Sequence, residues 1–504
     1  MSVAIRKQSI ISSLVIYLGF AIGMLNTLLY TNKAGWFTTA EYGYTTFLMQ
    51  SIIPIFYSLA SLSMPSYIYK FFPYYKANLN PRENDMLTLS LFVGFIGVIL
   101  VSIFGLVFQD VVVRKYSANG DLFVKYYYWV FPIGLGFTLY GILEAYAWGL
   151  HKSVFTNFLK EVQWRLFSTL LIVLFIFNII PDFSVFIKWF SFTYLALALI
   201  LFGYLFFTKK INITFKLSRV TIKFWPKIKR FCTMLYLAGQ MPILAQAFDT
   251  LVIASVLPNG MEKAGIFAIA QLMTSLVAAP QRGIVAASIP HLAQAWKDKN
   301  LNSINNIYKR SSINQLIFSA LIFILVLVNY DDAIITFGLT QNLLLGFTAF
   351  IFLGLNKVIE MGTGVNNYII GTSNYWRFEL TTGIILVALT LPLTYIFTKS
   401  FGIVGPPIAS LISIIVYNAI RIFFLWKKFR LFPFDRKTIY TILLTLAVWI
   451  MGYYFFRNMH SWAALFSRSI FMCVIFGAGV YFLNLTPDLK PVLQAIGKRL
   501  GRRK

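Results

Sequence analysis

Ionisable side chains lie inside long apolar stretches of this sequence. Asp249, Arg282, Lys357 and Glu360 each fall well within such a stretch. A charge at membrane depth is costly, so these residues commonly mark binding sites or ion pathways. Lys357 and Glu360 are three residues apart and would share one face of a helix. We therefore treat all four as candidates for binding a charged cargo or a coupling ion.

A second ionisable group lies near the ends of two neighbouring apolar stretches. It contains Glu144, at the end of one stretch, and Lys160, Glu161 and Arg165, at the start of the next. Long basic side chains so placed can also extend to the membrane surface, so a plain anchoring role for Lys160 and Arg165 stays open.

Structural roles also stay open for the first group. Lys357 and Glu360 could neutralise one another, because burying two opposite charges together costs less than burying one. Asp249 could hydrogen-bond to a neighbouring helix. Arg282 has no opposite charge three or four residues away, which favours a functional role.

The composition predicts that these residues sit in an integral membrane protein. Hydrophobic residues make up 58% of the 504 residues and charged residues only 12%. Such a chain must be covered largely by lipid or by itself. Its net charge of +27 would suggest nucleic acid in a soluble protein, but here the basic residues gather in alternate loops, and no nucleic-acid partner is expected.

We expect an all-α polytopic fold with about fourteen transmembrane helices, since about 20 apolar residues can cross a bilayer as a helix. The predicted spans are 9–30, 44–69, 86–107, 124–149, 154–179, 184–207, 231–257, 264–290, 312–328, 341–369, 376–398, 402–425, 438–456 and 465–485. Most of the 44 Lys and Arg residues fall in the loops on one side. The positive-inside rule then predicts cytoplasmic N- and C-termini.

Two distant segments resemble each other. Ala40–Tyr67 and Glu262–Leu292 each carry a glycine near their start, Gly43 or Gly265, followed by two prolines, Pro54 and Pro65 or Pro280 and Pro290. Internal repeats of this kind are typical of transporters built from two halves around a central site. The prolines would weaken their helices and are predicted hinges.

The repeat predicts two lobes of six helices each, related by a parallel pseudo-repeat, with two helices after them. The expected parts are an N-lobe at 1–208, a basic linker at 209–230, a C-lobe at 231–426, the last two helices at 427–486 and a basic tail at 487–504. In the linker, Lys and Arg alternate with large apolar residues. This pattern favours an amphipathic helix on an anionic lipid leaflet, although plain positive-inside anchoring explains it too.

Several classes of protein are disfavoured. No phosphate-binding GxxxxGK[ST] motif occurs, so the energy would come from a gradient of H⁺ or Na⁺ or of the substrate, with no other cofactor. The three histidines and the cysteines Cys232 and Cys473 lack the spacing of a metal or catalytic site. We expect no enzyme activity; a membrane polysaccharide polymerase or ligase is a remote alternative, since these usually have a large external loop.

The run from Phe248 to Trp296 resembles the signature of polysaccharide repeat-unit flippases in the multidrug/oligosaccharidyl-lipid/polysaccharide exporter superfamily. Asp249, Gly265, Phe267 and Pro290 match the Asp, Gly-aromatic turn and Pro of that signature. The segments AEYGY, from Ala40, and FGIVGPPIASLIS, from Phe401, are also similar. The resemblance extends over nearly the whole chain.

This resemblance implies a flippase of the bacterial inner membrane. Its cargo would be an undecaprenyl-diphosphate-linked oligosaccharide for O-antigen, capsule or exopolysaccharide, moved to the outer leaflet by alternating access. Arg282 and Lys357 would contact the diphosphate in a cationic cavity, and Arg165 and Lys160 would receive it. The carboxylates Asp249, Glu360 and Glu144 would tune the cavity or carry a coupling cation. Polysaccharide polymerase and chain-length proteins would be partners.

A cation-coupled multidrug exporter of the same superfamily is the alternative. It would need unpaired carboxylates facing an amphipathic pocket, whereas the intramembrane charges here are balanced between acids and bases.

Overall fold

The computed structural model describes residues 3–117, 120–150, 152–278, 281, 284–285, 288, 291–292, 295–296, 298–373, 375–456, 459 and 461–488. Every regular element in these ranges is helical, which confirms the expected all-α class. The chain divides into two compact units, residues 1–265 and 266–504. The predicted lobe boundaries at 208 and 231 stay a prediction.

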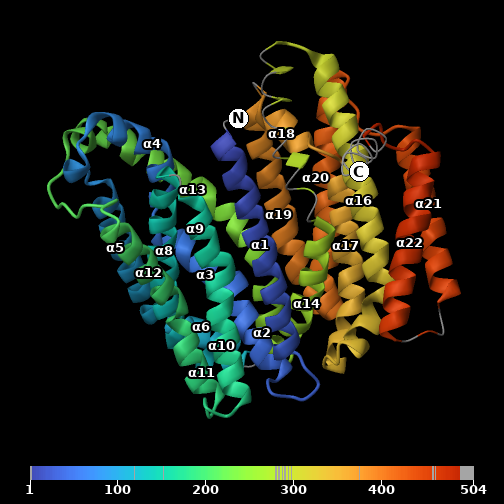
Figure 1. Ribbon diagram of the computed structural model, residues 1–504, viewed down its shortest axis with the longest axis horizontal. Coiled ribbons are helices and arrows are strands. Elements are labelled where there is room, and N and C mark those ends of the chain that lie inside the picture. The colour runs from blue at the N-terminus through green and yellow to red at the C-terminus, as the bar shows by residue number, and fades with distance from the viewer. Residues whose placement is uncertain are drawn as a thin grey trace, which may run out of the picture. The chain divides into compact units, whose positions relative to one another are not determined.

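The first unit is built around α8, which packs against α3, α4, α5 and α12 (Figure 1). The elements of this unit are α1 Val3–Tyr30, α2 Thr39–Phe47, η1 Leu48–Ile52, α3 Ile53–Ala60, α4 Met64–Asn78, η2 Pro81–Glu83, α5 Met86–Val107, α6 Gln109–Tyr116, α7 Asp121–Lys125, η3 Tyr127–Trp129, α8 Val130–Gly149, α9 Ser153–Asn157, η4 Phe158–Gln163, α10 Trp164–Ile176, α11 Phe183–Ser191, α12 Thr193–Phe207 and α13 Arg219–Val256. Helix α14, Gly260–Ala278, crosses the boundary between the units.

In the second unit, α17 packs between α16 and α20, and α21 and α22 lie beside α16 (Figure 1). The elements of this unit are α16 Leu301–Thr336, η5 Gln341–Gly346, α17 Phe347–Gly362, α18 Asn366–Gly371, α19 Trp376–Phe401, η6 Gly402–Val404, α20 Gly405–Phe429, α21 Arg436–Phe455 and α22 Trp462–Phe482.

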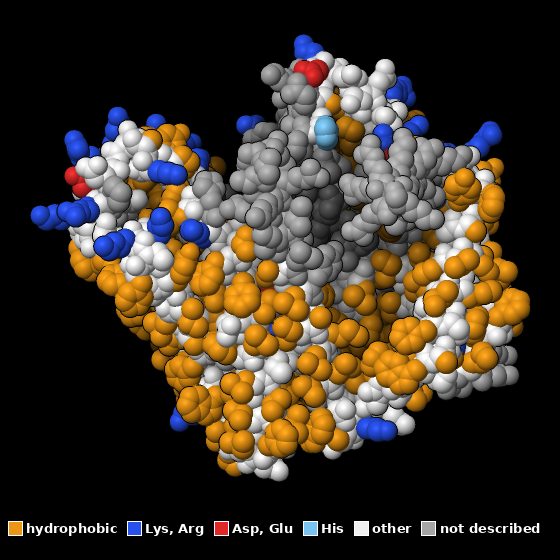
Figure 2. All heavy atoms as spheres, in the orientation of Figure 1, with side chains coloured by type: hydrophobic (Ala, Val, Ile, Leu, Met, Phe, Trp, Pro, Cys, Tyr) orange, Lys and Arg blue, Asp and Glu red, His pale blue; other side chains and the backbone are white. Residues whose placement is uncertain are grey.

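The helices carry the surface of a multi-pass membrane protein. Within the described ranges, nine helical segments are long and apolar enough to span a bilayer, or ten with one bent pair. One of the nine, residues 377–429, contains both α19 and α20. Figure 2 shows apolar side chains over the flanks of the helices and Lys and Arg side chains at their ends. On α5, for example, Phe92, Leu100 and Phe104 are exposed to the surroundings.

The predicted spans coincide with helical structure, apart from the second half of 264–290, of which only single residues are described. The span predicted at 86–107 matches α5, Met86–Val107. The basic linker differs from the expected separate helix. Residues 210–218 lack helical structure, and Arg219 begins α13, which continues without a break to Val256.

The glycines that open the two repeat segments pack against each other within the first unit. A Cβ on Gly43 would lie 1.8 Å from the Met261 carbonyl oxygen and 2.8 Å from the Gly265 nitrogen. A Cβ on Gly265 would lie 2.6 Å from the Thr39 carbonyl oxygen. Backbones can approach this closely only where both residues lack side chains. The glycine pattern therefore marks a helix crossing between α2 and α14.

A buried ion pair fixes α22 to α16. The Arg468 guanidinium donates to Asp332 at 2.7 Å, and both side chains are less than a tenth exposed. It also donates to the carbonyl oxygens of Val328, Phe456 and Met459 at 2.9 to 3.0 Å. Arg468 therefore joins α16, α22 and the end of α21 through charge-assisted hydrogen bonds.

Replacing Arg468 with alanine is expected to destabilise the second unit by about 3–5 kcal/mol, because it leaves the Asp332 carboxylate buried without its cation. The thermal midpoint of the purified protein in detergent measures this loss. Arg468→Ala with Asp332→Ala should recover part of it. A single variant that melts like the wild type would show that the pair contributes nothing to stability.

Candidate functional site

Each of the two ionisable groups singled out in the sequence contains at least one ion pair. In the first unit, Lys160 lies 3.4 Å from Glu144, and Arg165 lies 2.7 Å from Glu161. The first pair joins α8 to η4, and the second joins η4 to α10. The structure thus brings together the four residues that the sequence grouped. Lys160 is the more exposed member of its pair, at 38% against 11% for Glu144.

A local change of helix type positions Lys160 and Glu161. Both lie in η4, a π-helical segment between the α-helical stretches α9 and α10. A π-turn widens the helix and rotates the side chains that follow, and such turns are often found at functional sites. The predicted span 154–179 gave no sign of it, because its apolar pattern continues through the segment.

Arg165 rests on α1 because two glycines leave room for it. A Cβ on Gly19 would lie 2.6 Å from an Arg165 guanidinium nitrogen, and a Cβ on Gly23 would lie 2.9 Å from Arg165 Nε. One turn further along, Asn26 Nδ2 donates to the Arg165 carbonyl oxygen at 3.0 Å. The guanidinium is therefore held between α1 and α10 and is not extended freely to the membrane surface.

In the second unit, Lys357 and Glu360 pair on one face of α17. Their charged atoms are 2.7 Å apart, and both side chains are about a third exposed, at 36% and 30%. This geometry agrees with the predicted shared face. It leaves open both a structural pair and a cavity lining, since a partly exposed pair can do either.

Sequence analysis missed Arg421. This residue is 2% exposed and forms an ion pair with Glu379 of the adjacent helix α19. Its Nε donates to Thr382 at 3.3 Å, and its guanidinium lies 3.7 Å from the centre of the Tyr417 ring. A signal was available, because Arg421 falls inside the predicted span 402–425 and Glu379 inside the span 376–398.

Buried amides continue this polar region along α20. Asn418 Oδ1 accepts hydrogen bonds from Thr363 at 3.1 Å and Asn366 at 2.8 Å. The three residues connect α20 to the end of α17 and the start of α18. Hydrogen bonding across helices is what a polar group inside a membrane bundle requires. The second unit therefore has a polar interior as well as the Lys357–Glu360 pair.

Of the remaining predicted site residues, the structure describes Asp249 but not three others. Asp249 is buried in α13 and has a hydrogen-bonding or electrostatic interaction. Arg282, Pro280 and Pro290 lie outside the residues that the structure describes.

The second predicted span contains a break between the two prolines that were predicted as hinges. Pro54 follows the π-helical segment η1, and Pro65 is the second residue of α4. Between them, Leu62 and Ser63 have left-handed backbone conformations, and the two helical parts meet at 50°. A residue with a side chain adopts this conformation at some cost, so the break is a fixed feature of the chain. A hinge role for the prolines remains a proposal.

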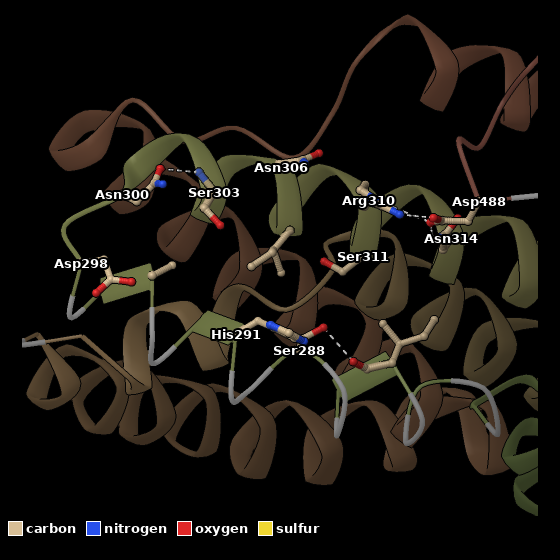
Figure 3. A pocket seen from close by; sticks show the side chains of 13 residues that line it. Ser288, His291, Asp298, Asn300, Ser303, Asn306, Arg310, Ser311, Asn314 and Asp488 are labelled. Atoms are coloured by element: carbon tan, nitrogen blue, oxygen red, sulfur yellow. Dashed lines mark hydrogen bonds and ion pairs between the residues drawn. The ribbon is translucent and has the colours of Figure 1, made fainter. Parts of the chain in front are cut away.

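A separate cavity of 580 Å³ opens at one end of the second unit (Figure 3). Its lining is mostly polar, with His291 and Ser288 on one side and Arg310 and Asn314 of α16 on the other. Arg310 and Asn314 both donate to Asp488. Partial burial raises the pKa of this carboxyl, but the two hydrogen bonds outweigh it and hold the pKa below its ordinary value. No group of His, Cys, Asp and Glu that could hold a metal occurs among the described residues.

No family model matches the chain, and no curated protein matches it. Solved structures do. The Lipid II flippase MurJ, in an inward closed conformation, has a TM-score of 0.72 at 14% identity, covering 94% of this chain and 99% of that one. An inward-facing multidrug resistance MATE family transporter of the MOP superfamily has a TM-score of 0.60 at 18% identity, covering 82% and 98%.

This chain has the fold of MOP superfamily transporters. A further MOP superfamily transporter, from Pyrococcus furiosus, matches with a TM-score of 0.53 at 17% identity, covering 84% of this chain and 95% of that one. It is described as having a binding pocket of reverse polarity that suggests a different function. At these identities the likeness shows the fold alone, and the cargo has to be argued from the residues of this chain.

Proposed function

We propose that this protein is a flippase that moves undecaprenyl-diphosphate-linked oligosaccharide repeat units from the inner to the outer leaflet of the bacterial cytoplasmic membrane. The observation that carries the choice of cargo is the pairing of every described intramembrane glutamate with a Lys or Arg, and the extent of the fold match supports it. The flippase of lipid II aligns over 94% of this chain, against 82% for the MATE transporter, and with the higher TM-score. The cargo would serve surface polysaccharide synthesis, by alternating access with both termini in the cytoplasm.

The charges of the two units support a cargo with a phosphate group. In the pairs Lys160–Glu144 and Lys357–Glu360, the lysine side chain is the more exposed member. Each pair therefore presents a lysine side chain that an approaching anion can contact. When the anion leaves, each lysine can again form its ion pair with the neighbouring glutamate. We assign substrate contact to Lys160, Arg165, Lys357 and Arg282, and cavity tuning or cation coupling to Glu144, Glu360 and Asp249.

A MATE-like exporter of organic cations is the second candidate, because such transporters share the fold. An organic cation would need a carboxylate that is free to bind it. Glu144, Glu161, Glu360 and Glu379 each form an ion pair with a Lys or Arg. These pairs favour the flippase over the exporter.

Deletion of the gene in its bacterial host separates the two candidates. The flippase proposal expects loss of surface polysaccharide and accumulation of lipid-linked repeat units on the cytoplasmic leaflet, with unchanged resistance to cationic dyes. A strain that keeps its polysaccharide and becomes dye-sensitive would overturn the proposal in favour of the exporter. Complementation with the wild-type chain is the control. Polymerase and chain-length proteins would be partners of a flippase and should be retained when the protein is isolated.

A further inference from the structure

A second, smaller cavity lies at the basic end of the first unit, where Lys and Arg side chains gather (Figure 2). Its volume is 290 Å³, and it lies between the turn after α4 and the chain entering α13. The residues that line it are Leu79, Arg82, Glu83, Thr214, Lys216, Leu217, Ser218 and Arg219. Three of these are basic and one is acidic, so the cavity attracts anions.

Hydrogen bonds fix the wall of this cavity in place. The Thr214 N–H donates to Thr88 Oγ1 at 3.2 Å, and the Ser218 N–H donates to Asp85 Oδ2 at 2.9 Å. Thr221 Oγ1 donates to the same Asp85 oxygen at 2.7 Å. Asp85 is 2% exposed, so these bonds form inside the protein. The segment that carries Lys216 is therefore held rigidly although it is not helical.

The three cations are available to a ligand. Among the residues that the structure describes, none of Arg82, Lys216 and Arg219 forms an ion pair. Arg219 is also the first residue of α13, a helix of 38 residues, so the positive end of the helix dipole lies at the edge of the cavity. Basic side chains beside a helix N-terminus are suited to a phosphate group.

The same segment presents exposed apolar side chains next to the polar ones. Thr214, Lys216 and Ser218 line the cavity, and so does Leu217, which is 57% exposed. The neighbouring Ile213 and Phe215 are 54% and 84% exposed. A segment that carries basic and exposed apolar side chains together fits the boundary between headgroups and acyl chains.

We infer that this cavity binds the phosphate headgroup of an anionic membrane lipid, whose acyl chains lie against Phe215 and Leu217. A free phosphate ion would use Arg82, Lys216 and Arg219 but gain nothing from the exposed apolar residues. A lipid uses both. The site shares no residue with the ion pairs assigned to the cargo, so it stands whatever the cargo is.

Native mass spectrometry of the purified full-length protein tests the inference, with phosphatidylglycerol and phosphatidylcholine as probes. The wild-type protein should retain phosphatidylglycerol preferentially. Because each basic residue near a lipid surface contributes about fivefold in affinity, the variant Arg82→Gln, Lys216→Gln, Arg219→Gln should lose at least about tenfold. Phe215→Ser should weaken lipid retention without changing the charge.

A matched control removes three positive charges from the same part of the chain outside the cavity: Lys209→Gln, Lys210→Gln, Lys223→Gln. All three side chains are exposed. The control should retain phosphatidylglycerol nearly as well as the wild type. An equal loss in the control would show unspecific attraction and overturn the site.

Competition with inorganic phosphate separates a lipid from a free phosphate ion. Displacement of the lipid by millimolar inorganic phosphate, with no effect of Phe215→Ser, would make the cavity a site for free phosphate and overturn the lipid proposal. The single variant Arg82→Gln should also retain less phosphatidylglycerol than the wild type, and one substitution is less disruptive to folding than three.

Discussion

Replacing Gly43 with alanine is expected to abolish transport and to lower the stability of the first unit. The added Cβ would lie 1.8 Å from the Met261 carbonyl oxygen. That oxygen belongs to the backbone of helix α14, so it cannot rotate away as a side chain can. Overpacking costs roughly 1–3 kcal/mol where side chains can adjust, and more where they cannot. The thermal midpoint in detergent and the surface polysaccharide of a complemented strain measure the two effects.

Gly383 in α19 provides the matched control, because a Cβ there would meet nothing within 4 Å. Gly383→Ala should retain transport and melt at or above the wild-type temperature, since alanine favours a helix over glycine by about 1 kcal/mol. Gly265→Ala should resemble Gly43→Ala. If Gly43→Ala transported normally, α2 and α14 would not depend on this close approach.

Replacing Lys357 with alanine is expected to abolish surface polysaccharide, and the double variant Lys357→Ala, Glu360→Ala should not restore it. The two residues form a partly buried ion pair, so the single variant leaves the Glu360 carboxylate without its cation and loses stability. Removing both charges should restore the stability. It cannot restore a cation that contacts the cargo.

The structural alternative for this pair gives the opposite pattern. If Lys357 only neutralises Glu360, the double variant should regain transport together with stability. The pair Arg310–Asp488, in which Arg310 is 48% exposed, is the control, since pairs open to solvent contribute only about 0–1 kcal/mol. Its single and double variants should all transport. Stability is read from thermal midpoints and transport from surface polysaccharide in the same strains.

Much of the fold follows from the apolar pattern, because a helix in lipid must be apolar along its length. The span predicted at 86–107 matches α5, Met86–Val107. The pattern could not show where helices bend. Helix type changes at η1 and η4, and the break before α4 lies at left-handed Leu62 and Ser63, two residues before Pro65. Local packing decides these positions.

Charged pairs within one helix could be predicted, and pairs between helices only in part. Lys357 and Glu360 are three residues apart, so helical periodicity alone places them together. Arg421 and Glu379 are on separate helices, and only the packing of α19 against α20 brings them together. Arg421 lies near the end of a predicted span, where a basic residue is ordinarily assigned to the adjoining loop. In the structure α20 continues to Phe429, so Arg421 lies inside the helix and is buried.

The non-helical chain before α13 shows the limit of composition as evidence. Alternating basic and apolar residues predicted an amphipathic helix from 209 to 230. Residues 210–218 have no helical structure, and Asp85 and Thr88 supply hydrogen-bond partners for the backbone at Ser218 and Thr214. These partners come from α5 and the residue before it, so the local sequence alone could not show them.

The most direct test of the proposed function uses the purified protein in liposomes. Undecaprenyl-diphosphate-linked repeat units from the host would be placed in both leaflets, and their accessibility to a glycosidase outside the vesicles would be followed. The flippase proposal predicts that the wild-type protein exposes the inner pool, and that Lys357→Ala does not, while Gly383→Ala does. Liposomes that expose no more cargo than empty vesicles, yet take up or release a cationic dye when a cation gradient is applied, would contradict it.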